Sequence, residues 1–499
     1  MSKKADDLQN RFPTRMWIVA ACVGGVCVAC GAEAPDDSVE SIGEVDQAAV
    51  KKVYNIDIRR SLVVTEKPIL DRFSFQRVME QLVDESGVPG LTATALFQQW
   101  WDTQNPGPGL GAGAHCDDQV DAQGTVLNGY PYLCRPAPSE GSQAACDPFA
   151  PNSPCAYIPI ALFNRFDQAP ENGAHCGEHR IVYAKASGVA DSSNRNVVIF
   201  EANMANPLPA QGLKGCKKIV ETWAKLTDVA NIETRADKLE AFYFDGVGLT
   251  QPPVVSLANF GDNPNGRGQI RTNQLVNTDT GWSLREFKLL RECAGGNCTA
   301  LRFVPVTNKT NAFGGLFDPA STHPLADDFR AYFPTQVASL AATDINKISM
   351  EVPDMFNSGQ SQSSGTFAAE MRYLDQLGSG PSDLRTAIQA ELTSLGSTLS
   401  VDEIVRRAQT TSCAGCHRLS AQADLGGGLV WPDSQPRFVH VTERQTEIVD
   451  GVERFVISEG LLNVFLPNRK LILDDFMNNK PRPPGGKPTL PIGGSADHG

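Results

Sequence analysis

Cysteines constrain the fold of this 499-residue chain more than any other residue type. Three of the thirteen cysteines precede residue 31, and two more form a Cys-x-x-Cys pair near the C-terminus. The other eight form an even set: Cys116, Cys134, Cys146, Cys155, Cys176, Cys216, Cys293 and Cys298. In an exported protein, such a set is typical of a disulfide framework. The sequence therefore predicts four disulfides; the alternative is that several of the eight are free buried thiols.

The spacing of these cysteines suggests how they pair. Cys293 and Cys298 flank a turn-like Ala-Gly-Gly-Asn loop, which favours a local disulfide across a hairpin. Proximity along the chain favours two further pairs and leaves one long-range pair: Cys116–Cys134, Cys146–Cys155 and Cys176–Cys216. The insert 103–154 is rich in Gly, Pro and Cys and has little periodic structure, so we expect it to depend on these disulfides.

The N-terminal segment has the features of an export signal. Basic residues precede an apolar run over residues 16–29: Lys3, Lys4, Arg11 and Arg15. The run is too short to span a bilayer and matches the hydrophobic region of a secretory signal peptide. We therefore expect residues 1–29 to be a signal peptide and the protein to be exported to an oxidising compartment.

Residues 27–30, Cys-Val-Ala-Cys, resemble a bacterial lipobox, in which the last cysteine receives lipid. The resemblance implies lipidation of Cys30, although Cys27 stands where the box usually has leucine. Gly31 follows, which by resemblance to enteric lipoproteins favours the outer membrane, with the periplasm or the cell surface as the exposed side. Residues 30–55 would then be a lipidated flexible tether to the membrane. The alternative is an ordinary signal peptide cleaved near residues 29–34.

Charge and composition limit the partners of the chain. A hydrophobic content of 41% in 499 residues is enough for one large core or two to three smaller ones. The net charge is −13, and the signal peptide carries a net +2, so the mature chain has a net charge near −15. No Lys/Arg cluster interrupts this acidic balance, which excludes nucleic acid as a partner and is compatible with a basic redox partner protein.

Periodicity divides the body of the chain into regions. Residues 56–316 have an α+β pattern, with helices expected at 71–85, 91–101, 214–226 and 235–242. Six runs in this region have the composition of strands: 180–184, 196–201, 253–259, 269–273, 282–290 and 301–306. Residues 317–398 form a helical connecting region, residues 399–479 are mostly helical, and residues 480–499 are a Pro/Gly-rich tail that we expect to be disordered.

The pentapeptide Cys413-Ala414-Gly415-Cys416-His417 has the spacing of a c-type haem attachment site. Two thiols three residues apart can each form a thioether bond with a vinyl group of haem c, and His417 is then placed to be the proximal iron ligand. One alternative is a redox or structural disulfide with an incidental histidine. A zinc knuckle is another, but it needs further ligands at suitable spacing.

The sequence around this motif resembles the cytochromes c over the last fifth of the chain. Ser400 and Glu403 form a capping box before a helix that runs into Cys413. Pro467 suits the first turn of a closing helix, whose apolar positions recur at helical spacing. The resemblance implies a mostly α cytochrome c-like domain at 399–479, following an α+β domain with disulfides. The remaining four fifths of the chain resembles no known family.

The sixth haem ligand departs from the family pattern. Cytochromes c usually have a methionine before the last helix, but no Met lies between His417 and Met477. His440 is the only histidine in that interval and is one candidate; Met477 is the other. A surface histidine in a strand is an equal alternative for His440, and the iron would otherwise be five-coordinate.

A second histidine pattern is weaker. Residues 175–179, His-Cys-Gly-Glu-His, match the inverted zincin motif, which needs both histidines on one face of a helix. Gly177 weakens a helix, and a predicted strand follows at once, so a structural role is favoured.

Three functions are compatible with these features. The first is a lipid-anchored c-type haem protein of the periplasm or cell surface that transfers electrons through one covalent haem to a redox partner. The second is a haem-containing oxidoreductase whose α+β domain binds a substrate. The third is a binding lipoprotein without haem, in which Cys413 and Cys416 form a fifth disulfide.

Overall fold

The computed structural model describes residues 53–122, 124–135, 140–246, 248, 251–262, 266–276, 281–433 and 440–480. These residues belong to one compact unit that begins at Val53. The predicted signal peptide, Cys30, the tether up to residue 52 and the tail from residue 481 lie outside the described residues. Among the helices within those ranges, none is long and apolar enough to cross a membrane.

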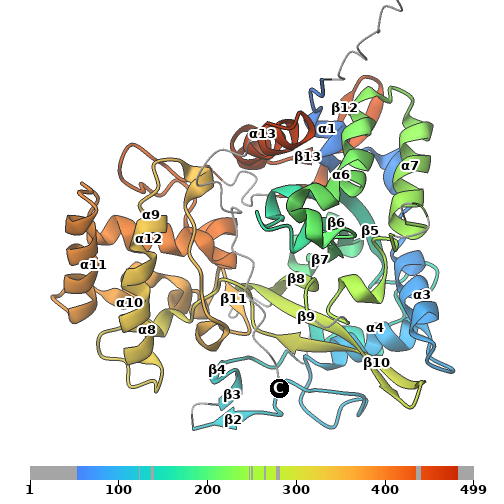
Figure 1. Ribbon diagram of the computed structural model, residues 1–499. Helices are drawn as coiled ribbons and strands as arrows, with labels where there is room; N and C mark the ends of the chain where they lie inside the picture. Colours follow the sequence, from blue (N-terminus) through green and yellow to red (C-terminus); the bar gives the residue numbers. More distant parts are fainter. Residues whose placement is uncertain are drawn as a thin grey trace, which may run out of the picture. The chain divides into compact units, whose positions relative to one another are not determined.

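An antiparallel eight-stranded sheet organises the unit (Figure 1). Seven strands follow the order β1-β5-β6-β7-β8-β9-β10, and β11 pairs with β9 beside this path. The strands are β1 (Val63–Val64), β5 (Tyr157–Arg165), β6 (His175–Lys185), β7 (Asn196–Ala205), β8 (Gln269–Val276), β9 (Gly281–Ala294), β10 (Asn297–Val306) and β11 (Ser361–Gln362). Four of the predicted strands lie within β6, β7, β8 and β9, and the fifth within β10.

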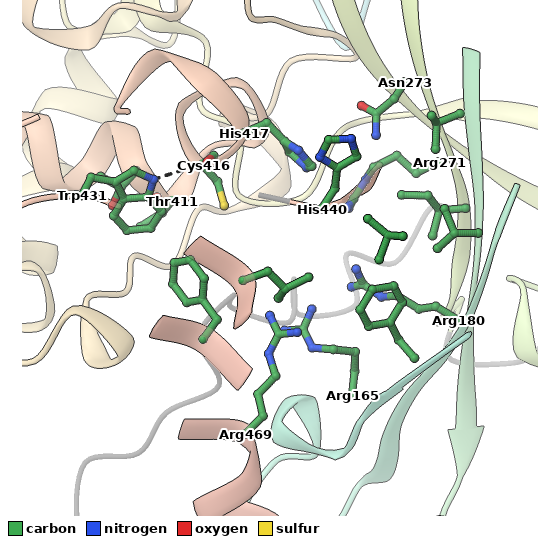
Figure 2. Close-up of a pocket in the computed structure, with 18 of the residues that line it drawn as sticks. Arg165, Arg180, Arg271, Asn273, Thr411, Cys416, His417, Trp431, His440 and Arg469 are labelled. Atoms are coloured by element: carbon green, nitrogen blue, oxygen red, sulfur yellow. Dashed lines mark hydrogen bonds between the residues drawn. The ribbon is translucent and has the colours of Figure 1, made fainter. Parts of the chain in front are cut away.

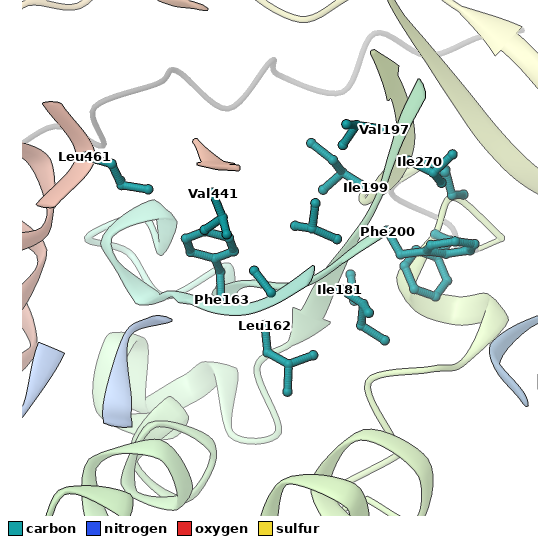
Figure 3. Packing of buried hydrophobic residues seen from close by; sticks show 14 of the residues in the cluster. Leu162, Phe163, Ile181, Val197, Ile199, Phe200, Ile270, Val441 and Leu461 are labelled. Atoms are coloured by element: carbon teal, nitrogen blue, oxygen red, sulfur yellow. The ribbon is translucent and has the colours of Figure 1, made fainter. Parts of the chain in front are cut away.

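Alternation along the strands gives the sheet two different faces. Ile181, Phe200 and Ile270 point to one side, whereas Val197 and Ile199 point to the other (Figure 3). The first face is fully covered by helices and packed with aromatic rings; for example, Tyr183 donates a hydrogen bond to the carbonyl of Phe73. The second face carries apolar and charged residues together and forms one wall of a cavity.

The helices that cover the first face come from the α+β region. They include α3 (Phe75–Ser86), α4 (Ala93–Asp102), α6 (Lys217–Ala224) and α7 (Ile232–Phe244). Ser74 and Thr92 cap α3 and α4 with their side-chain oxygens, as expected for N-cap residues. The four predicted helices therefore match in place and type. Short helices lie at the ends of nearby strands: α1 (Ile58–Ser61), α2 (Lys67–Leu70) and α5 (Ser187–Ala190).

All four predicted disulfides are present: Cys116–Cys134, Cys146–Cys155, Cys176–Cys216 and Cys293–Cys298. The first of them encloses a small three-stranded sheet of β2 (Val120–Asp121), β3 (Gly124–Leu127) and β4 (Tyr130–Pro131). The predicted strand 253–259 is wrong: this segment is a loop that ends in a short 3-10 turn at Leu257–Asn259. Pro253, and Pro252 just before the segment, remove backbone donors that a strand needs.

The connecting region is helical, as predicted, with α8 (Ala326–Tyr332), α9 (Val337–Leu340), α10 (Tyr373–Leu377) and α11 (Asp383–Ser394). The C-terminal region contains α12 (Val401–Thr411), the hairpin β12 (Val441–Val449) and β13 (Val452–Ile457), and α13 (Leu466–Met477). The hairpin was not expected in a mostly α region. One hydrophobic core runs from Ile56 to Met477, so the region 399–479 shares its core with the α+β region.

Candidate functional site

A cavity lies between the second face of the sheet and the Cys-x-x-Cys-His turn (Figure 2). It contains about 1220 Å³ of space not filled by atoms, its opening to solvent included. Strands β5 to β9 form one wall, and the segments from α12 to α13 form the other. Cys416, His417 and His440 all line it. The structure thus brings three of the predicted site residues to one cavity.

Local geometry explains why the pentapeptide turns where it does. The Ser400–Glu403 capping box begins α12, as predicted, and the Ser412 amide ends it by donating to the Gln409 carbonyl. A π-helical turn then spans Gly415–Leu419. A Cβ atom at Gly415 would lie 1.7 Å from the Gln409 carbonyl oxygen, so this position requires glycine. The turn is joined to the sheet because Ala414 N donates to Ser361 Oγ of β11 at 2.9 Å.

Arg407 fixes α12 against its surroundings. Its side chain is 1% exposed and donates four hydrogen bonds to backbone carbonyls at 2.7–3.0 Å. The acceptors belong to two different segments: Leu340, Ala342, Leu425 and Gly426. The guanidinium therefore ties the helix before the motif both to the connecting region and to the loop after the motif.

His417 and His440 approach each other inside the cavity, and Figure 2 shows their rings side by side. Burial, and after it the positive charge of His440, lower the pKa of His417 to about 3. A neutral imidazole has a lone pair available for a metal ion at physiological pH. His440 is held at the start of the hairpin, where its amide donates to Ser458 Oγ at 3.0 Å. Two imidazoles from different segments of the chain therefore line the same cavity.

Cys413 and Cys416 both carry free thiols, whereas the other eight cysteines of the described residues are disulfide-bonded. Burial raises the pKa of Cys413 to about 12 and also raises that of Cys416. Catalytic Cys-x-x-Cys pairs have a lowered pKa instead. Cys413 packs against Trp282 and Leu284 of β9, and the Cys416 carbonyl accepts a hydrogen bond from Trp431 Nε1 at 3.4 Å.

The walls of the cavity are largely apolar. Val182 and Ile199 are paired across β6 and β7, so their side chains share the cavity face of the sheet. On the opposite wall, Trp431 and Phe465 are in ring contact, with centroids 5.5 Å apart. Such walls can bury a large planar apolar group.

Arginines from the sheet interrupt these apolar walls. Glu201 is fully buried and lies between Arg180, at 3.0 Å, and Arg271, at 3.2 Å. Arg271 also pairs with Glu286 at 2.5 Å, and Arg180 with Glu178 at 2.5 Å. Each of these two guanidinium groups therefore has carboxylate partners on two sides.

The other predicted site residues lie elsewhere. Met477 is 4% exposed at the end of α13 and packs in the hydrophobic core; it is not among the described residues that line the cavity. The His175–His179 pattern lies on strand β6, not on a helix, which agrees with a structural role. Within the described ranges, no three His, Cys, Asp or Glu side chains form a group that could hold a metal ion.

The sequence interpretation missed strand β5 and the cavity that the sheet forms with the motif region. Strand β5, which supplies Phe163 and Arg165, was not predicted, because Pro159 interrupts its apolar run. The hairpin that positions His440 did have a signal: Asp450-Gly451 between alternating residues is typical of a two-residue hairpin turn, and both residues have positive φ.

Comparison with known proteins found no protein family, no curated protein and no solved structure that matches this chain.

Proposed function

We propose that this protein binds one haem c covalently through Cys413 and Cys416 and transfers electrons to or from a redox partner protein. His417 is the proximal ligand and His440 the sixth ligand. The observation that carries the proposal is that Cys416, His417 and His440 line one cavity with apolar walls. When bound, the haem supplies one-electron exchange between ferric and ferrous iron.

The residues present fit such a group. The donor set comprises two thiols that stay unpaired in a chain whose other described cysteines are bonded, and two imidazoles that line the same cavity. Val182, Ile199 and Phe465 supply apolar surface and exclude water, and buried arginines of the same cavity would supply positive charge for the carboxylates of a haem. Ligation by two histidines implies a lower reduction potential than ligation by His and Met.

The first experiment is a pyridine haemochrome assay and a reduced-minus-oxidised spectrum on protein from a host with c-type maturation. We expect one covalent haem per chain, and none in the Cys413→Ala/Cys416→Ala variant. The matched control, Cys293→Ala/Cys298→Ala, removes a disulfide at a hairpin end and keeps its haem. Absence of haem in the unmodified protein, while a control cytochrome matures in the same cells, would contradict the proposal and favour a binding lipoprotein without haem.

The sixth ligand has its own test. We expect His440→Ala to keep its covalent haem but to change from a six-coordinate low-spin to a five-coordinate high-spin spectrum that binds carbon monoxide when reduced. His323→Ala is the control, because His323 stacks on Tyr130 and does not line the cavity. An unchanged spectrum in His440→Ala would show that His440 is not a ligand of the iron.

Export and lipid anchoring complete the proposal, with the protein at the outer membrane or the cell surface. The basic and apolar N-terminal segment and the lipobox-like residues ending at Cys30 support this location. Cys30→Ala is expected to move the protein from the membrane fraction to the soluble periplasmic fraction.

A haem-containing oxidoreductase is the second candidate function. A polar cavity of about 530 Å³, its opening included, adjoins the motif and is lined by Cys413, His417, Glu178 and Lys309. Its charged residues suit a small polar substrate next to the haem. Reduction or oxidation of the haem by such a substrate, without a partner protein, would favour this function over electron transfer alone.

A further inference from the structure

One end of the cavity contains two arginines that share a single carboxylate. Arg165 leaves strand β5 and Arg469 leaves helix α13, and both side chains point into the cavity (Figure 2). The Arg165 guanidinium forms a bidentate pair with Asp167, with distances of 2.9 Å from Nε to Oδ1 and 2.8 Å from Nη2 to Oδ2. The nearest approach of Arg469 to Asp167 is 3.6 Å, from Nε to Oδ2.

Arg469 has poor compensation for its burial. Its side chain is 11% exposed, and its Nε is a buried donor without a hydrogen-bond partner among the described residues. Burial, and after it the positive charge of Arg165, lower the pKa of Arg469 to about 9. A buried guanidinium next to a like charge is costly unless an anion balances it.

The other arginines that line the cavity have more carboxylate partners. Arg180 and Arg271 meet three buried carboxylates between them: Glu178, Glu201 and Glu286. At the Arg165–Arg469 end, by contrast, both guanidinium groups approach the same carboxylate, Asp167. Arg469 reaches it at 3.6 Å without a hydrogen bond from its Nε, inside a cavity with apolar walls.

We propose that Arg165 and Arg469 form a binding site for a carboxylate inside the cavity. The carboxylate has two sources: a propionate of the haem, which rests on the proposed function, or a small carboxylic acid that enters from solvent. In both cases Arg469 donates to the carboxylate through its planar guanidinium while Asp167 holds Arg165 in place.

The test compares Arg469→Gln with Lys470→Gln in the holoprotein. Lys470 is the next residue of α13, pairs with Asp474 and does not line the cavity. For a haem propionate, the resonance Raman bending mode of the propionates shifts in Arg469→Gln and stays unchanged in Lys470→Gln. Arg469→Lys keeps the positive charge but lacks the planar guanidinium, so it gives a smaller shift of this mode.

Binding of a small carboxylic acid from solvent is tested by calorimetric titration of the unmodified protein with succinate. Neutral succinamide is the control. Saturable binding of succinate but not succinamide, weakened at least tenfold in Arg469→Gln, identifies a free carboxylate as the ligand. The proposal is overturned if the Raman mode is the same in Arg469→Gln and Lys470→Gln and succinate does not bind.

The outcomes separate this proposal from the proposed function. If the unmodified protein carries no haem, the proposed function fails, and succinate binding by the haem-free protein alone decides whether the carboxylate site exists. If haem is attached and neither measurement responds to Arg469→Gln, only the carboxylate site fails.

Discussion

The two walls of the cavity differ in how they are held together. The sheet wall belongs to a region with four disulfides, and helices packed with aromatic rings cover its other face. The motif wall has no disulfide among its described residues and depends on capping, on Arg407 and on packing against the sheet. The difference indicates that the sheet wall forms a rigid frame, whereas the motif wall is stable only when it is docked on that frame.

This contrast changes how the resemblance to cytochromes c should be interpreted. A self-contained haem domain would take both walls from residues 399–479. Here Val182, Ile199 and Arg271 lie far upstream of the motif in the chain and still line the same cavity as His417. The chain thus combines a short Cys-x-x-Cys-His segment with a pocket wall supplied by the α+β region.

The largest effect is expected on the sheet side, from the long-range disulfide. Cys176→Ala/Cys216→Ala opens a loop with a sequence separation of 40 residues, which by chain entropy lowers the free energy of unfolding by about 4 kcal/mol. Cys293→Ala/Cys298→Ala, with a separation of 5, should cost about 2 kcal/mol. Urea unfolding measures both; equal losses would show that the frame does not depend on its long-range crosslink.

On the motif side, Arg407→Met is expected to lower the free energy of unfolding by about 3 kcal/mol, because it removes four hydrogen bonds to backbone carbonyls. Arg406→Met is the control, since Arg406 is only half-buried. In limited proteolysis, the first cleavage of the Arg407→Met variant should fall within residues 399–433. Cleavage that begins in the sheet region would contradict the proposed difference between the walls.

A smaller effect concerns acid stability of the sheet region. His179 is 1% exposed between Trp223 and Phe242, and burial lowers its pKa to about 3. The unfolded chain takes up a proton below about pH 6.5, so the folded state loses stability as the pH falls from there toward 3.

His179→Phe removes this proton uptake. Between pH 7.5 and pH 5 the unmodified protein should lose about 2 kcal/mol more than the variant, as measured by urea unfolding at both pH values. Parallel pH profiles for the two proteins would show that His179 is protonated in the folded state.

The disulfide pairs and most regular elements of the sheet region could be predicted from the sequence. Parity and spacing of cysteines suffice when the partners are close, as for Cys293 and Cys298, and the last pair follows by elimination. Residues 181–184 of strand β6 form an apolar run with β-branched and aromatic residues, and helix α3 has a clear period of 3.6 residues.

The cavity could not be predicted in the same way. Arg180 and Arg271 alternate with apolar residues along their strands, a pattern that is typical of a solvent-exposed face. Only the docking of the motif region on that face makes them buried, and such a long-range contact has no local signal. Arg469 illustrates this most clearly, because its partner Asp167 lies some three hundred residues earlier in the chain.

The burial of the two free thiols has a consequence for the order of assembly. Cys413 is 9% exposed and packs against Trp282 and Leu284, so an attachment enzyme has little access to its sulfur in the folded protein. Under the proposed function, the haem would therefore be joined to the chain before the motif docks. Under the same proposal, the sheet strands would cross a secretion channel before the motif, and a chain without haem would expose an apolar sheet face to the surrounding chaperones and proteases. Haem attachment would then decide between completion of the fold and degradation.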